Sequence, residues 1–146
     1  MNVDPGVRYF LDTNILVYAY DLSAGQKHDL AVQLVEACWE NDNGCLSIQV
    51  LQEFYVTVTR KIAAPMIPQT ARQLVADLAH WHLHTPDAGD LLQAIDLQQD
   101  YQLSFWDAQV VHSATSLGCK LLLSEDLNHL QTYGQTQVIN PFKELD

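Results

Sequence analysis

Residues 7–14 read VRYFLDTN, a short apolar run that ends in three polar residues, the first of which is Asp12. Such a run is typical of a buried strand with a polar end. A second run, residues 119–123 (CKLLL), is followed by the polar residues 124–126 (SED). We therefore expect two buried strands whose carboxyl ends carry acidic side chains.

Segments with a helical spacing of apolar residues separate the short apolar runs. The predicted strands cover residues 7–11, 45–48, 81–85, 119–123 and 137–139. The predicted helices cover residues 15–20, 27–40, 48–58 (capped by Ser47), 68–80, 87–101 and 104–117, with a short helix before the last strand. This alternation predicts a three-layer α/β/α sandwich around a mainly parallel five-stranded sheet, in one domain over residues 1–146.

Composition excludes several classes of protein. With 146 residues, 48% of them hydrophobic, the chain is long enough and apolar enough for one folded core, which excludes a disordered chain. The longest apolar run, residues 15–20, is too short to span a membrane, and no secretory signal pattern precedes it. Three cysteines without a C-x-x-C pair predict buried reduced thiols and a cytoplasmic setting.

The net charge of −11 limits how the chain can bind nucleic acid. Seven Lys and Arg residues against 18 Asp and Glu residues argue against electrostatic coating of nucleic acid or of an anionic membrane. Bound cations can reverse the charge of a local site, however, so a nucleic-acid enzyme is compatible with this balance.

Four acidic residues fall at places that an α/β sheet brings together. Ligand sites in open α/β sheets lie beyond the carboxyl ends of the strands. Asp12 and Asp126 follow two predicted strands, Glu53 lies in the second turn of a helix after another strand, and Asp107 lies in the first turn of a helix. Converging carboxylates repel one another unless a cation bridges them, and oxygen ligands favour Mg²⁺ or Mn²⁺. The pattern predicts metal-assisted hydrolysis of a phosphodiester bond.

Each acid also has an interpretation without catalysis. Asp12 suits an Asx-turn or a helix cap, and Asp107 stands three residues after Ser104, which is the spacing of a capping box. Glu53 fits a solvated helix face and Asp126 fits a turn. Each signal is weak alone, and the four placements together favour the metal site.

Histidines 80, 82 and 84 alternate with Trp81 and Leu83. Their period of two places them on one face of a strand, where they suggest a transition-metal site. The favoured interpretation is the more solvated face of an edge strand, because central parallel strands are apolar on both faces. Glycine-rich phosphate loops and a serine nucleophile elbow do not occur in the sequence.

Four segments, in this order, resemble the acidic segments of a PIN domain. They are YFLDTNILVYAYD (9–21), SIQVLQEFYVTVTRK (47–61), LSFWDAQVVHSA (103–114) and LLLSEDLN (121–128). Residues 138–142 (VINPF) resemble the last strand and end of the VapC-type toxins within that family. The resemblance implies a Mg²⁺- or Mn²⁺-dependent ribonuclease, commonly the toxin of a toxin–antitoxin pair.

The resemblance also implies roles for individual residues. The implied metal-binding and catalytic acids are Asp12, Glu53, Asp107 and Asp126. Asn14 resembles the asparagine that orients the first acid, and Ser124 resembles the hydroxyl residue beside the fourth. One departure is Leu130, where many close relatives have glycine. Hydrolysis by an activated water would leave 5′-phosphate and 3′-hydroxyl ends.

The partners expected from the resemblance are an RNA substrate, a cognate antitoxin protein and a second copy of the chain, with no membrane. Arg60 and Lys61, at the end of the predicted helix that carries Glu53, are candidates for contacts with the RNA backbone. Both also suit a helix C-terminus, where basic side chains complement the helix dipole.

Two other classes of function remain open. A PIN fold can hold RNA or protein without cutting, although all four acids are present here. A phosphatase or phospho-acceptor domain also places an aspartate after its first strand. Haloacid-dehalogenase-like phosphatases require a second aspartate at the position where this chain has Asn14. Receiver domains require a lysine after a late strand, whereas Lys120 lies at the beginning of one.

Overall fold

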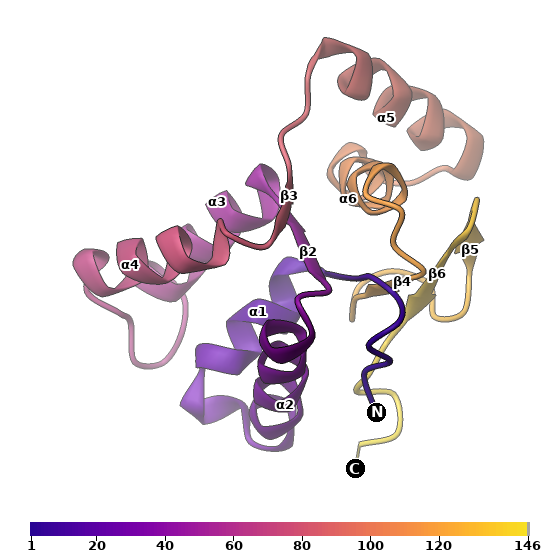
Figure 1. The fold of residues 1–146 in the computed structure, drawn as a ribbon. Helices are drawn as coiled ribbons and strands as arrows, with labels where there is room; N and C mark the ends of the chain where they lie inside the picture. Colours follow the sequence, from indigo (N-terminus) through magenta and orange to yellow (C-terminus); the bar gives the residue numbers. More distant parts are fainter. Residues whose placement is uncertain (146) are drawn as a thin grey trace.

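The computed structural model describes residues 1–145, and a six-stranded sheet in the order β3-β2-β1-β4-β6-β5 lies at its centre (Figure 1). The strands are β1 (Tyr9–Leu11), β2 (Gly44–Ser47), β3 (His82–His84), β4 (Leu121–Leu123), β5 (Thr132–Tyr133) and β6 (Thr136–Ile139). All neighbours pair in parallel except β5 and β6, which form an antiparallel hairpin. The predicted parallel five-stranded sheet is confirmed, and the two-residue β5 is an addition to it.

The helices agree closely with the predicted ones. They are α1 (Thr13–Tyr20), the 3-10 helix η1 (Leu22–Ala24), α2 (Gln26–Asn41), α3 (Ile48–Arg60), α4 (Pro68–Leu78), α5 (Ala88–Tyr101) and α6 (Phe105–Ser116). The predicted cap is confirmed at α3, where the Ser47 hydroxyl accepts the Val50 N–H over 3.2 Å. Ser104 caps α6 by accepting the Asp107 N–H over 3.1 Å.

The short helix predicted before the last strand is wrong. The segment after β4 forms turns, and Leu130 adopts the left-handed conformation with φ of 72°. Its N–H donates to the Val138 carbonyl over 2.8 Å, and the Val138 N–H donates to the Gln131 carbonyl over 2.9 Å. Pairing with the last strand therefore uses the backbone groups that a helix would need.

Helices cover both faces of the sheet. In Figure 1, α1 and α2 lie on one side of the sheet and α6 lies on the other, with α5 stacked on the outside of α6. The strands supply fully buried side chains such as Phe10, Leu46 and Leu122, and α1 adds Ile15 and Leu16. Because the central strands are buried on both faces, their sequences are continuous apolar runs, as parallel sheets require.

The order of the strands reverses between β1 and β4. The chain builds β2 and β3 on one side of β1, and it builds β4 and β6 on the other side. At the carboxyl ends of this central pair, the Asp12 N–H donates to the Leu123 carbonyl over 2.9 Å. Open α/β sheets form their ligand sites at such a switch point.

Two predictions about individual side chains are confirmed. The cysteines Cys38, Cys45 and Cys119 are buried free thiols, and β3 is an edge strand. The solvated face predicted for its histidines does not extend to His84, whose side chain is only 12% exposed, and His80 precedes the strand in a turn. Among residues 1–145, none of the helices has the length and apolar composition needed to cross a membrane.

Candidate active site

Asp12 is the first acid of the site, and it is buried, with 6% of its surface exposed. It caps α1, since its Oδ1 accepts the Thr13 N–H over 2.8 Å. Its Oδ2 accepts a hydrogen bond of 2.8 Å from the Ser124 hydroxyl. Asp12 therefore caps α1 and also lies at the end of β1, so the cap that the sequence allowed is compatible with a role as metal ligand.

Burial raises the pKa of Asp12 to about 6. The hydrogen bonds from Ser124 and Thr13 oppose this rise, whereas the nearby carboxylates of Asp126 and Glu53 add to it. Among residues 1–145, Asp12 forms no salt bridge with a Lys or Arg side chain. A buried carboxylate next to two others, without a basic partner, fits the environment of a cation ligand.

Ser124 organises the loop that follows β4. Besides donating to Asp12, its Oγ accepts the N–H groups of Asp126 and Leu127 over 3.2 and 3.4 Å. Asn14 holds the same loop from α1: its Nδ2 donates to Asp126 Oδ2 over 3.1 Å, and its Oδ1 accepts the Glu125 N–H over 3.3 Å. The structure thus places Asn14 against the fourth acid, whereas the sequence resemblance assigned it to the first.

Glu53 reaches the same place from α3. Its Oε2 accepts the Thr13 hydroxyl over 2.8 Å, and its Oε1 accepts the Gln49 amide over 3.1 Å. Thr13 is bonded to Asp12 through its backbone and to Glu53 through its side chain. One residue therefore fixes the position of two of the four acids relative to each other.

Asp107 stands in the first turn of α6 and is linked to the other acids indirectly. The Gln49 Nε2 that bonds Glu53 also donates to the Trp106 carbonyl over 3.2 Å. Gln49 thereby joins α3 to the residue before Asp107. Among the described residues, the Asp107 carboxylate makes no hydrogen bond with the other three acids. The structure therefore joins three acids in one network and links the fourth to it only through Gln49 and the Trp106 backbone.

A groove of about 390 Å³ runs past this network. Asn14, Glu53 and Asp126 line it together with Lys61. Of the two predicted RNA-binding residues, Lys61 borders the groove, whereas Arg60 is exposed at the end of α3 and does not line it.

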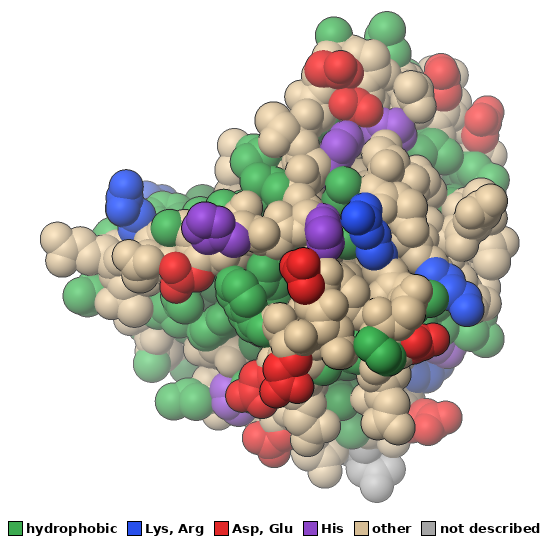
Figure 2. Space-filling view, viewed as in Figure 1, with side chains coloured by type: hydrophobic (Ala, Val, Ile, Leu, Met, Phe, Trp, Pro, Cys, Tyr) green, Lys and Arg blue, Asp and Glu red, His purple; other side chains and the backbone are tan. Residues whose placement is uncertain are grey.

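The candidate site itself is acidic, since its groove is lined by Glu53 and Asp126 with one basic residue, Lys61. On the face that Figure 2 draws, acidic side chains are spread from α5 at the top towards α2 at its base, rather than gathered into one patch. The four candidate acids offer only oxygen donors, which match the preference of Mg²⁺ and Mn²⁺. The residues present therefore fit a hard divalent cation.

Sequence reasoning missed two parts of the site. Gln49 stands four residues before Glu53, one helical turn away, so the spacing alone could have identified it as a neighbour. The second part is a support for the loop after β4, where Glu125 accepts the Tyr18 hydroxyl over 2.6 Å and pairs with Lys27 over 2.5 Å. No local pattern indicates that contact, because its members are far apart in the sequence.

Comparison with known families identifies the fold. The family model of the PIN domain matches residues 9–135. The chain belongs to the PIN-domain family. A comparison with curated protein sequences finds no match.

Solved structures share the architecture of this PIN domain. A toxin–antitoxin complex from Klebsiella pneumoniae is 20% identical, with a TM-score of 0.63 over 88% of this chain and 94% of that one. VapBC2 from Rickettsia felis, bound to a promoter DNA fragment, is 18% identical, with a TM-score of 0.62 over 89% and 96%. VapC20 from Mycobacterium tuberculosis, a toxin that cleaves the sarcin-ricin loop, is 16% identical, with a TM-score of 0.58 over 78% and 86%. At these identities, the likeness establishes a shared fold.

Proposed function

We propose that this PIN domain is a Mg²⁺- or Mn²⁺-dependent endoribonuclease that acts as the toxin of a toxin–antitoxin pair. The observation that carries the proposal is the buried Asp12 carboxylate at the switch point of the sheet, with Glu53 and Asp126 close enough to raise its pKa further. RNA is proposed as the substrate from the resemblance to VapC-type toxins, and the similar structure VapC20 is a toxin that cleaves the sarcin-ricin loop.

Each acid has a proposed part in the reaction. Asp12 and Asp107 would hold the cation directly, and Glu53 and Asp126 would hold a second cation or orient the waters around the first. When bound, the cation lowers the pKa of an attacking water and neutralises charge on the phosphate. Ser124 and Asn14 keep the acids in place, since their side chains bond Asp12 and Asp126. The products would carry 5′-phosphate and 3′-hydroxyl ends.

The surroundings of Asn14 favour phosphodiester hydrolysis over an aspartate-based phosphatase reaction. A haloacid-dehalogenase-like phosphatase would need a carboxylate at position 14, but here an amide donates to Asp126 instead. The remaining alternative, a PIN fold that binds RNA or protein without cutting, predicts binding with no metal-dependent cleavage.

An antitoxin protein is the proposed partner. Two of the similar solved structures are toxin–antitoxin assemblies. We expect the pair to act in the cytoplasm, where the buried thiols of this chain stay reduced.

Incubation of the purified protein with total RNA and Mg²⁺, followed by mapping of the new ends, tests the proposal. We expect cleavage that EDTA and the variants Asp12→Asn and Asp107→Asn abolish, with 5′-phosphate ends. The matched control is Asp29→Asn, which removes an exposed acid of α2 that does not line the groove. RNA binding without cleavage would favour the binding module, and full activity of Asp12→Asn would refute the assigned site.

A further inference from the structure

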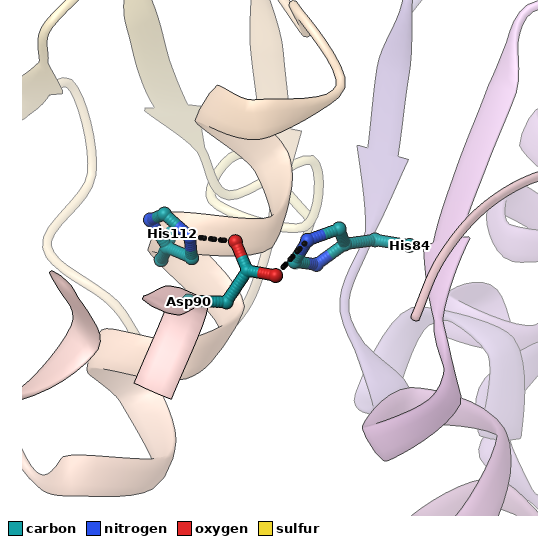
Figure 3. Close-up of side chains that lie close together, drawn as sticks. All are labelled: His84, Asp90 and His112. Carbon is teal, nitrogen blue, oxygen red and sulfur yellow. Dashed lines mark hydrogen bonds and ion pairs between the residues drawn. The ribbon is translucent and has the colours of Figure 1, made fainter. Parts of the chain in front are cut away.

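A second cluster of metal-ligating side chains lies outside the carboxylate site. His84 comes from β3, Asp90 from the first turn of α5 and His112 from α6, and Figure 3 shows the three side chains pointing towards one another. Nε2 of His112 lies 2.7 Å from Asp90 Oδ1, and Nε2 of His84 lies 3.4 Å from Asp90 Oδ2. The donor atoms all lie within 4.8 Å of one another.

The side chains are mostly shielded and are held by further hydrogen bonds. The side chains of His84, Asp90 and His112 are 12%, 21% and 9% exposed. Nδ1 of His84 lies 2.7 Å from the Ser113 hydroxyl, which leaves Nε2 directed at the cluster. Asp90 Oδ2 accepts the Asp87 N–H over 2.9 Å in the capping box of α5. Each of the three side chains is therefore held on a different element, β3, α5 or α6.

We propose that His84, Asp90 and His112 form a binding site for a borderline divalent cation, with Zn²⁺ as the ion that suits it best. Two imidazole nitrogens and one carboxylate oxygen are a frequent three-ligand zinc set, and a water takes the fourth position. Bonds of about 2.0–2.1 Å in a tetrahedral site place neighbouring donors roughly 3.4 Å apart. The two separations from Asp90, 2.7 and 3.4 Å, need only a small opening to reach that spacing. The donor nitrogens of the two histidines lie within 4.8 Å of each other and would move closer on binding.

The surroundings orient the ligands towards one point. An ion would take the place of the proton that His112 Nε2 and Asp90 Oδ1 share over 2.7 Å, and that proton would be released on binding. The contact of His84 Nδ1 with Ser113 resembles the outer hydrogen bond that orients metal-ligating histidines. His112 also lines a cavity of about 370 Å³ between α5, α6 and β5, which provides a path for the ion and its water.

The ion would fasten a weakly attached helix. In α5 only Ala94 is buried, and the helix packs mainly on α6. A cation held by β3, α5 and α6 together would join α5 to the edge of the sheet. This effect on α5 is independent of the carboxylate site, so the proposal stands whether or not the protein cuts RNA.

Isothermal titration of Zn²⁺ into Asp12→Asn protein, with millimolar Mg²⁺ present, tests the site while the carboxylate site is disabled. We expect one Zn²⁺ per chain and a rise in Tm on saturation. Three variants in the same background each remove one proposed ligand: His84→Gln, Asp90→Asn and His112→Gln. Loss of a hydrogen bond to a metal ligand typically weakens metal binding by roughly 10–100-fold, and we expect loss of the ligand itself to weaken it more. Circular dichroism confirms that each variant is folded.

His82→Gln is the matched control, because His82 lies on the same strand but bonds the Asp42 carbonyl. It should bind Zn²⁺ as tightly as the parent. Substituting Co²⁺ gives a second readout: its visible absorption should show nitrogen and oxygen ligands, and it should vanish in His112→Gln. Unchanged Zn²⁺ affinity in all three cluster variants, or no binding at micromolar Zn²⁺, would overturn the proposal and leave a histidine–aspartate ion pair in its place.

Discussion

The Ser124 hydroxyl donates a hydrogen bond of 2.8 Å to Oδ2 of Asp12, and both side chains are buried where β1 and β4 end. This bond stabilises the charged form of a carboxylate that burial destabilises. The balance still leaves the pKa of Asp12 at about 6, above its ordinary value of 3.8. Without a metal, ionisation of Asp12 therefore lowers the free energy of unfolding.

The first prediction concerns the pH dependence of stability without metal. Because the pKa of Asp12 is higher in the folded chain, its contribution to stability is complete below pH about 4 and is lost as the pH rises through about 6. The gap between 3.8 and about 6 corresponds to about 3 kcal/mol. We expect the free energy of unfolding in EDTA to fall over this range, as urea unfolding at several pH values would measure.

Asp12→Asn is the control for that prediction, because the amide does not titrate and the Ser124 hydroxyl can turn to accept its N–H. The variant should lose most of this pH dependence and should be more stable than metal-free wild type at pH 7.5. Added Mg²⁺ should stabilise wild type and not the variant. Parallel pH curves for the two proteins would show that Asp12 is not the destabilising group.

The second prediction concerns Gln49, whose amide bonds both Glu53 and the Trp106 carbonyl. Gln49→Leu keeps the helix but removes the link between α3 and the start of α6. Outer hydrogen bonds to metal ligands typically support about 10–100-fold in metal affinity or activity. We expect a loss of that size in RNA cleavage, with a higher Mg²⁺ requirement. Gln69→Leu, an exposed position on α4, should cleave normally.

Local sequence patterns explain why most of the fold was predictable. Buried parallel strands such as β1 are continuous apolar runs, and the caps Ser47 and Ser104 mark where helices begin. The same strand ends place Asp12 and Asp126 at one edge, so the site's first members follow from topology. These features depend on neighbours in the sequence.

The features that the sequence did not predict depend on distant contacts. Leu130 does not continue a helix because its N–H pairs with Val138 across the hairpin region. His84 is visible as one of three alternating histidines, but nothing in its spacing indicates that Asp90 and His112 face it. Contacts of this kind can be identified only once the positions of α5 and α6 relative to β3 are known.

The third prediction concerns Gly44 in β2. A Cβ at this position would lie 2.4 Å from two ring carbons of Trp81 and 3.0 Å from the Cβ of Cys38. The Trp81 ring is buried and cannot move freely, so Gly44→Ala overpacks the core. We expect a loss of about 1–3 kcal/mol in the free energy of unfolding. Gly89→Ala, at the start of α5, should cost much less, because its Cβ would meet only the exposed Asp87 side chain, at 3.3 Å, which can shift by a few tenths of an ångström.

The fourth prediction is that the protein forms a homodimer. Large apolar side chains are exposed on α5 and at the start of α6, including Leu92 at 62% and Trp106 at 61%. Burying such side chains against a second copy would remove apolar surface from water. Light scattering at tens of micromolar should give twice the mass of one chain, and a monomeric mass would contradict the prediction.

The last prediction concerns how a chain with a net charge of −11 holds RNA. Lys61 lines the same groove as Glu53 and Asp126, whereas Arg60 lies outside it. Lys61→Ala should therefore weaken RNA binding more than Arg60→Ala, although each change removes one positive charge from the end of α3. With so few basic residues, the number of phosphate contacts is small, and affinity should fall only shallowly with salt.

Divalent cations should control the affinity instead, because they neutralise the carboxylates beside the phosphate. RNA binding by Glu53→Gln, if this variant still takes up metal without cleaving, should be measured across separate salt and Mg²⁺ series. A strong dependence on Mg²⁺ with a shallow dependence on salt is the expected result. Steep salt dependence without metal dependence would mean that a basic surface holds the RNA. Equal effects of Lys61→Ala and Arg60→Ala would contradict RNA binding along the groove.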